Sequence, residues 1–141
     1  MIIDGKDLVL GRLASFAARK ALLGEKVDIV NCEEVLISGS KKTVLARFHK
    51  LMDLGCQKAF KGPFVTRLPD RIVRKAVKRM LPIRRGRGRD AYHNVMCYIG
   101  VPDELKGQET CTFKNAELTS LSTLKYMKLK DVSKQIGGKV Y

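Results

Sequence analysis

The residues of this sequence most able to do chemistry are cations concentrated in one stretch. Residues 41–89 hold 16 Lys and Arg but only two acids, Asp53 and Asp70, out of 28 bases and 14 acids in the 141-residue chain. That stretch accounts for the whole formal net charge of +14, because residues 1–40 and 90–141 together are neutral. Like charges at this density repel one another unless a polyanion neutralises them. The pattern therefore favours a nucleic-acid partner over an ordinary solvated surface or an anionic membrane.

Within this stretch, residues 70–81 separate charge from apolar surface at helical spacing. At about 100° per residue, the apolar side chains fall in one arc of about 140°. The other arc is entirely cationic and consists of Arg71, Arg74, Lys75, Lys78 and Arg79. Asp70 stands where a carboxylate favours the helix N-terminus, and Pro82 ends the helix. The pattern predicts a helix that packs with one face and offers cations to phosphates with the other.

A glycine-arginine run follows this helix. Residues 83–89 contain two glycines, at 86 and 88, among Arg84, Arg85, Arg87 and Arg89. Glycine keeps a backbone adaptable, and each guanidinium can fork onto phosphate oxygens or stack on a base. We expect an Arg-Gly loop that contacts RNA.

Two predicted helix N-termini lie beside further cations. Gly11-Arg12 opens the first helix, and Gly39-Ser40-Lys41-Lys42 opens the second. Free backbone N–H groups at such ends can bind phosphate without catalysing a reaction. Ordinary helix capping explains the same residues. Adding Lys61 and Arg67 from the irregular stretch 54–69, the predicted RNA-binding residues are Arg12, Lys41, Lys42, Lys61, Arg67, Arg71, Arg74, Lys75, Lys78, Arg79, Arg84, Arg85, Arg87 and Arg89.

Patterns for catalysis or metal binding are weak. The turn at Gly11 lacks the three-glycine dinucleotide fingerprint, and residues 38–43 lack the first glycine of a phosphate loop. Glu33 and Glu34 are adjacent, so on a strand they point to opposite faces and make a poor acid/base pair. The four cysteines show no Cys-x-x-Cys spacing. These missing patterns argue against an enzyme, and we expect no cofactor, no metal and no small-molecule substrate.

The elements that position these residues follow from hydrophobic periodicity. Strands are predicted at 8–10, 27–31, 35–37, 95–99 and 125–129, and helices at 12–23, 41–53, 70–81 and 131–136. The first strand, helix and strand make a βαβ unit, which implies a parallel pair. The longest apolar runs are too short to cross a bilayer. We expect one α/β domain over residues 1–141, with a basic RNA-binding segment at 41–89 and no membrane partner.

Several short motifs, in order and spacing, resemble the thirteenth protein family of the large ribosomal subunit, in its archaeal and eukaryotic branch. They are Leu10-Gly11-Arg12-Leu13-Ala14-Ser15, Val30-Asn31-Cys32-Glu33, Ile37-Ser38-Gly39, Gly62-Pro63, Pro69-Asp70-Arg71-Ile72, Met80-Leu81-Pro82, Arg85-Gly86-Arg87-Gly88-Arg89 and Gly100-Val101-Pro102. One departure is Lys78-Arg79, where the family usually has Arg-Gly before Met-Leu-Pro.

The resemblance implies a three-layer α/β/α domain with a mainly parallel central sheet, carrying the basic helix and the Arg-Gly loop. It also implies a structural role in the cytoplasm, in the ribosome, with large-subunit ribosomal RNA and neighbouring large-subunit ribosomal proteins as partners. Two other functions stay open on the sequence. One is a small nucleotide- or RNA-processing enzyme built on the βαβ unit, and the other is a DNA-compacting protein.

Overall fold

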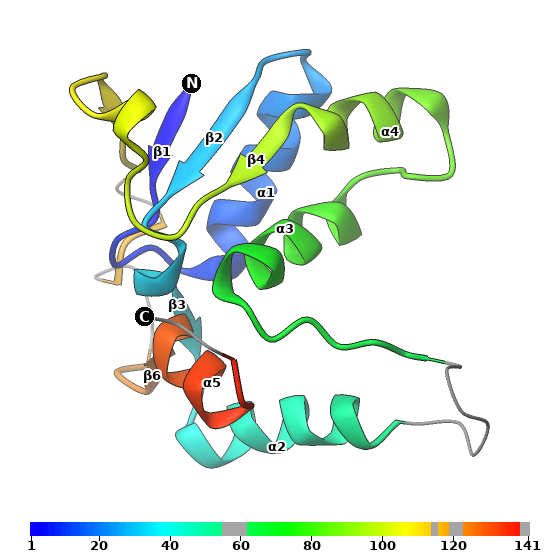
Figure 1. The fold of residues 1–141 in the computed structure, drawn as a ribbon, viewed down its shortest axis with the longest axis vertical. Helices are drawn as coiled ribbons and strands as arrows, with labels where there is room; N and C mark the ends of the chain where they lie inside the picture. The colour runs from blue at the N-terminus through cyan, green and yellow to red at the C-terminus, as the bar shows by residue number, and fades with distance from the viewer. Residues whose placement is uncertain (55–61, 114–115, 119–122, 139–141) are drawn as a thin grey trace.

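A four-stranded parallel sheet occupies one half of the molecule (Figure 1). The structure is a computed structural model that describes residues 1–54, 62–113, 116–118 and 123–138. The strands are β1 (Ile2–Asp4), β2 (Val27–Val30), β4 (Val95–Cys97) and β5 (Thr110–Cys111), in the order β4-β2-β1-β5. Every pairing in this sheet is parallel. The predicted parallel arrangement is confirmed.

Three helices pack on one face of this sheet: α1 (Leu10–Leu22), α3 (Pro69–Met80) and α4 (Gly86–His93). Their apolar side chains form one buried cluster with Ile29 and with Val27 and Val95, which are paired across β2 and β4. On the opposite face Asp28 pairs with Met96, whose side chain is 40% exposed. The helix α3 therefore packs on the face of the sheet that carries the buried cluster.

The other half of the molecule is a small antiparallel sheet with its own helices. It pairs β3 (Leu36–Ser38) with β6 (Tyr126–Lys128), and α2 (Lys41–Asp53) and α5 (Leu129–Gln135) pack beside it. The mixed α/β class with a mainly parallel central sheet is confirmed. Within the described residues, Val44 of α2, Met127 of β6 and Val132 of α5 form a small buried cluster that joins these helices to the second sheet.

The predicted strand at 8–10 is wrong. Leu8 and Val9 form only isolated bridges, the chain takes a left-handed turn at Asp7 (φ 56°), and α1 already begins at Leu10. The first strand is β1 instead, so the βαβ unit is correct but starts earlier in the chain. Leu8 is apolar because it is buried near the junction of the two sheets, and a short apolar run does not by itself distinguish strand from other buried backbone.

The predicted Arg-Gly loop is also wrong over its second half, because α4 begins at Gly86. Ala91 of α4 is buried in the core, and α4 contacts α1. These tertiary contacts outweigh the low helix propensity of two glycines. The other elements lie where the periodicity places them: α2 has the predicted bounds, and α1, α3, α5, β2, β3, β4 and β6 differ by at most two residues at an end.

The motifs at residues 30–33 and 100–102 meet just after strands β2 and β4, where contacts of their side chains hold turns in place. Asn31 adopts a left-handed conformation (φ 53°), and its Nδ2 donates to Asp4 Oδ1 at 2.9 Å. Both carboxylate oxygens of Glu33 accept from the backbone N–H of Gly100, at 3.0 and 3.1 Å. The side chain of Glu33 therefore has a structural role, because it holds the turn at Gly100.

The described cysteines are free thiols, and Cys32 is fully buried at the end of β2. Its hydrogen bond with Cys97 and its burial raise the pKa of the Cys32 thiol far above its ordinary value. A thiol held protonated is a poor nucleophile. Cys32 is therefore suited to packing as a small hydrophobic residue, and Cys97 is half-buried.

Candidate nucleic-acid interface

The helix α3 separates its two faces as the periodicity predicts. Ile72, Val73 and Val77 are buried against the sheet and α1. Pro69 and Asp70 lie in its first turn, and no acid follows within the helix. The five predicted cations all lie on the outer side, with Arg71, Lys78 and Arg79 exposed and Arg74 and Lys75 half-buried. Met80 departs from the pattern, since it is 44% exposed.

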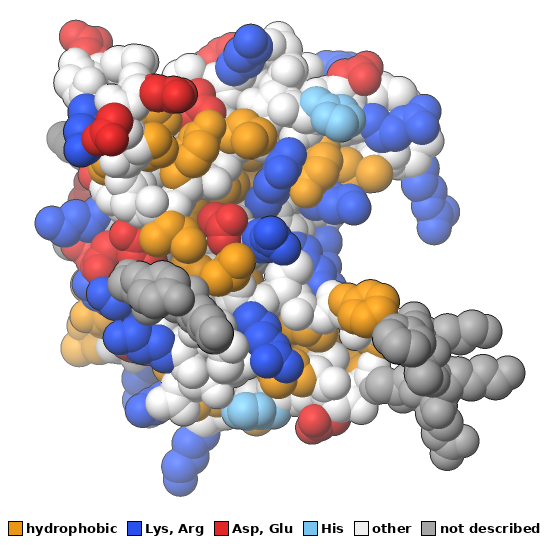
Figure 2. Space-filling model, in the orientation of Figure 1, with side chains coloured by type: hydrophobic (Ala, Val, Ile, Leu, Met, Phe, Trp, Pro, Cys, Tyr) orange, Lys and Arg blue, Asp and Glu red, His pale blue; other side chains and the backbone are white. Residues whose placement is uncertain are grey.

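A basic hollow forms where α3 turns into α4. It has a volume of about 710 Å³ and is lined by Lys75, Lys78, Arg79, Leu81, Pro82, Ile83, Arg84 and Arg85. Five of these eight residues are cations and none is an acid. Figure 2 shows Lys and Arg side chains gathered over this part of the molecule. The backbone N–H groups at the start of α4, which has no acid in its first turn, add to the positive potential.

Tyr92 of α4 supports the side of α3 that faces away from α2. The guanidinium carbon of Arg74 lies 4.8 Å from the centre of the Tyr92 ring, and the Lys78 ammonium lies 5.5 Å from it. The Nε of Arg74 is buried and has no hydrogen-bond partner among the described residues. Cation–π attraction therefore fixes both stems. Arg74 has a packing role as well as its charge.

Among the remaining arginines of residues 83–89, Arg87 has a structural contact. Its Nη2 donates to the backbone carbonyl of Leu22 at 3.2 Å, at the C-terminal end of α1. A cation there complements the helix dipole and ties α4 to α1. Arg89 is exposed. Neither side chain lines the basic hollow.

Arg12, Lys41, Lys42 and Arg67 do not line the basic hollow. Arg12, on α1, is exposed, as are Lys41 and Lys42 at the start of α2. At that start the side chain of Ser40 accepts from the Thr43 N–H at 3.3 Å, so ordinary capping already uses one donor. Arg67 lies beside α5, where its carbonyl accepts from the Ser133 hydroxyl at 2.6 Å. Lys61 lies outside the described residues.

A second concavity, the α2–α3 cleft, contains residues that the sequence analysis did not single out. It has a volume of about 340 Å³, and its cations are Arg47, Lys75 and Arg79. Arg47 and Phe48 of α2 enter the same cleft as Met80 of α3. In the sequence, Arg47 stands beside the apolar stripe that residues 44–52 form on one face of the helix. Helical periodicity does not show which other helix packs against that stripe, so it does not place Arg47 in a cleft.

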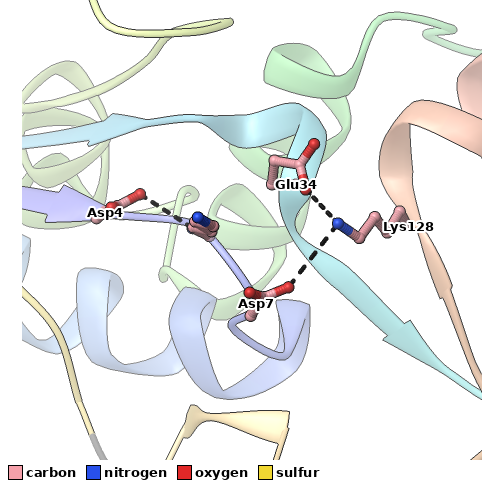
Figure 3. Close-up of polar contacts among 5 residues, drawn as sticks. Asp4, Asp7, Glu34 and Lys128 are labelled. Atoms are coloured by element: carbon pink, nitrogen blue, oxygen red, sulfur yellow. Dashed lines mark hydrogen bonds and ion pairs between the residues drawn. The ribbon is translucent and has the colours of Figure 1, made fainter.

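An ion-paired cluster lies apart from these basic surfaces, between the two sheets (Figure 3). The ammonium of Lys128 on β6 is hydrogen-bonded to the carboxylate of Glu34 and lies 3.9 Å from Asp7 Oδ1. Lys128 holds the pKa of Glu34 below its ordinary value, and Glu34 raises the pKa of Lys128. The ion pair of Glu34 with Lys128 therefore links the segment before β3 to β6.

Replacing Glu34 by Gln is expected to lower the free energy of unfolding at neutral pH by less than about 1 kcal/mol, because both partners are partly exposed. A lowered pKa means that the ionised carboxylate stabilises the fold above its unfolded pKa, and that this contribution is lost as pH falls through its folded pKa. Urea unfolding at pH 7 and near pH 3 measures both values. Equal differences between Glu34→Gln and the unaltered protein at the two pH values would contradict the assignment.

Comparison with known proteins decides what kind of protein carries these surfaces. A family model described as "Ribosomal protein L13" matches residues 1–104, which include α3 and α4. This chain belongs to the ribosomal protein L13 family. The family resemblance seen in the sequence motifs is therefore confirmed, and the basic hollow and the α2–α3 cleft are features of an L13-family fold.

Relatives in the L13 family match along nearly the whole chain. A protein named "Large ribosomal subunit protein uL13" from Methanococcoides burtonii is 42% identical over 138 residues, covering 98% of each chain. Proteins of that name from Methanosarcina barkeri and Archaeoglobus fulgidus are 42% and 40% identical, and cover 98% and 96% of this chain and 98% and 86% of their own. These relatives are archaeal ribosomal proteins and not enzymes. The enzyme hypothesis is therefore set aside.

The described part of this L13-family chain offers few groups for other kinds of site. It contains no cluster of three or more His, Cys, Asp and Glu side chains arranged to hold a metal ion. Among the described helices, none is both long and apolar enough to span a membrane. What the described surface does offer is cationic concavities on and around α3.

Proposed function

We propose that this protein is a structural constituent of the large ribosomal subunit. It binds and organises large-subunit ribosomal RNA through the cationic face of α3 and through the Arg-Gly segment, residues 83–89. The observation that carries the proposal is the basic hollow, in which five cations from α3 and residues 84–85 converge without an acid. Phosphates of a folded RNA provide the complementary charge. The names of the relatives support the subunit, and with it a place in the cytoplasm, in the ribosome.

The cations contact phosphates, and they recognise the shape of the RNA more than individual base edges. The chain has no Trp, four Tyr and five Phe, so it lacks the aromatic platform of a single-strand reader. Arg and Lys at the hollow form hydrogen bonds with phosphate oxygens, which position a protein on RNA without carrying sequence information. The expected function is therefore to fix the relative position of neighbouring RNA segments.

Neighbouring ribosomal proteins are the second class of partner in the proposal. Met96, Ile99 and Val101 are each about 40% exposed, near the outer face of β4 and the turn that follows it. Exposed apolar residues close together in the chain are typical of protein contacts. The acids Asp103 and Glu104 follow in the next turn, η2 (Asp103–Leu105). This side suits a basic protein segment, while the α3 side binds RNA.

Sedimentation tests the assignment to the large subunit. The native protein is expected to co-sediment with large subunits and to remain bound through a high-salt wash that removes loosely bound proteins. A protein that washes off and binds duplex DNA as tightly as large-subunit RNA at equal salt would instead be a DNA-compacting protein. Binding constants for both nucleic acids at the same salt concentration make this comparison valid.

A further inference from the structure

The α2–α3 cleft has the features of a site for a single nucleotide. We propose that one unstacked nucleotide of the bound ribosomal RNA inserts its base between α2 and α3, while its phosphates contact Arg47, Lys75 and Arg79. This inference rests on the proposed function and deepens it, because it names the part of the RNA that the cleft would take. It adds a base-binding element to a surface that otherwise contacts the RNA backbone.

The walls of the cleft are apolar. Phe48 and Leu51 lie on the α2 side, and Ala76 and Met80 lie on the α3 side. The volume of about 340 Å³ is at the lower end of the range of small-ligand pockets, which run from roughly 300 to 1,000 Å³. Unstacked RNA bases are commonly held against aromatic rings and guanidinium planes, and the described lining of this cleft offers the ring of Phe48 and the guanidinium groups of Arg47 and Arg79.

The charge at the cleft selects a phosphate-bearing occupant. Among the described residues, its charged lining residues are Arg47, Lys75 and Arg79, and none of those that line it is an acid. Lys75 and Arg79 also line the basic hollow, so the two concavities share one cationic border on α3. A strand with phosphates over the hollow can therefore place the next nucleotide at the cleft without leaving cationic surface.

Hydroxyl groups give the apolar cleft a small polar component. Ser38 lies at the end of β3, and Thr66 lies in the segment before α3. A hydroxyl both donates and accepts, so it can pair with the edge of any base. We therefore expect binding of a base in this position without strong preference among the four.

A protein segment is the competing occupant, and the cleft fits it less well. An amphipathic helix binds in a groove through apolar anchors at i, i+3 or i+4, and i+7. Such a helix would also have to bring acids to Arg47, Lys75 and Arg79. A nucleotide satisfies the apolar walls and the cations with one compact group, and RNA already lies at the shared border in the proposed function.

Filling the cleft without changing its charge tests the inference. Ala76→Trp places a large side chain between the two helices and keeps every cation. Stacking of one base is worth roughly 1 to 3 kcal/mol, which is about 5- to 150-fold in affinity. We expect Ala76→Trp to weaken binding of large-subunit ribosomal RNA by about tenfold or more in filter binding, with the same dependence on salt. Ala46→Trp, at an exposed position of α2 outside the cleft, is the matched control and is expected to bind normally.

A second variant and a second measurement cover the case in which Ala76→Trp fails to fold. Phe48→Leu keeps an apolar side chain and removes the ring, and it is expected to lower affinity severalfold. Ultraviolet crosslinking of the protein–RNA complex is expected to join a base to residues 41–53 of the unaltered protein, and Phe48→Leu is expected to reduce that crosslink.

The inference is wrong if folded Ala76→Trp, or Phe48→Leu where the first variant does not fold, binds RNA like the unaltered protein. It is also wrong if no crosslink forms within residues 41–53. If cleft variants keep full RNA affinity but no longer bind an acidic neighbouring protein, the occupant is a protein segment. The proposed function would survive each of these results, because it depends on the salt slope of the α3 cations, which these substitutions leave in place.

Discussion

Replacing Arg71, Lys75, Lys78 and Arg79 together by Gln is expected to flatten the salt dependence of RNA binding. Each phosphate contact contributes roughly 0.7 to 0.9 to the slope of log affinity against log salt concentration. If all four side chains contact phosphates, the slope falls by about 3. Filter binding of large-subunit ribosomal RNA over a series of KCl concentrations gives both slopes.

The structure decides which cations belong in that variant. Arg74 is left unchanged because it is half-buried beneath Tyr92, and its loss would alter the packing of α3 on α4. The four chosen residues are exposed or half-buried on the outer side of α3, so Gln is tolerated there. Near-native melting temperatures would verify this.

A matched control removes the same charge from elsewhere. Arg19, Lys26, Lys125 and Lys134 are exposed and lie in the parts of the chain that sum to zero charge. Their joint replacement by Gln is expected to leave the slope within about one unit of the unaltered value. If the control variant loses as much slope as the α3 variant, binding follows net charge, and the α3 surface is not the RNA-binding site.

Replacing Gly88 by Ala is expected to be the most destabilising methyl addition in the Arg-Gly segment. A Cβ at this position would lie 2.1 Å from the Pro82 carbonyl oxygen and 2.4 Å from its carbon, both of which are backbone atoms. Backbone cannot rotate away as a side chain can, so α4 must move away from residues 82–83. Such overpacking costs about 3 kcal/mol or more, which for a chain of this size lowers Tm by roughly 10 °C.

Gly86→Ala is the control for this prediction, because a Cβ there meets no atom within 4 Å. Gly86 is the first residue of α4, and Ala at a helical position reduces the entropy of the unfolded chain. We therefore expect no loss of stability in Gly86→Ala. Thermal unfolding followed by circular dichroism compares the two variants. Similar Tm values for both would show that α4 does not pack on residues 82–83 as described.

Loss of the α4 contact is also expected to weaken RNA binding. The segment between α3 and α4 positions Arg84 and Arg85 at the rim of the basic hollow. When α4 moves, these guanidinium groups lose their fixed distance from Lys78 and Arg79. Gly88→Ala is therefore expected to reduce RNA affinity at temperatures where the protein is still folded, whereas Gly86→Ala is not.

The elements with a complete helical pattern were predictable from the sequence. Residues 41–53 and 70–81 have an apolar stripe, a polar remainder and a boundary residue, Ser40 for the first and Pro82 for the second. Such patterns depend on residues three and four positions apart, which are local in the chain. The structure has both helices within a residue of the predicted bounds.

The two incorrect predictions share a cause. Residues 8–10 are apolar because they are buried where the two sheets meet, and residues 86–89 are helical because Gly88 lies against Pro82 and Ala91 enters the core. Packing contacts outside the local helical or strand pattern decide both segments. Local propensity carries no information about such contacts, and here it favoured a strand in one case and a loop in the other.

The location of the charge follows from residue types alone: the surplus of +14 lies within residues 41–89, with five of its cations on one face of a helix. Charge and helical periodicity are properties of residue type and spacing, so they need no tertiary structure. Only the fold decided which cations share a surface. It brought Arg84 and Arg85 to α3, tied Arg87 to the end of α1, and placed Arg47 across a cleft from Lys75 and Arg79. Those positions depend on how the helices pack on the two sheets, and packing joins residues that are far apart in the chain.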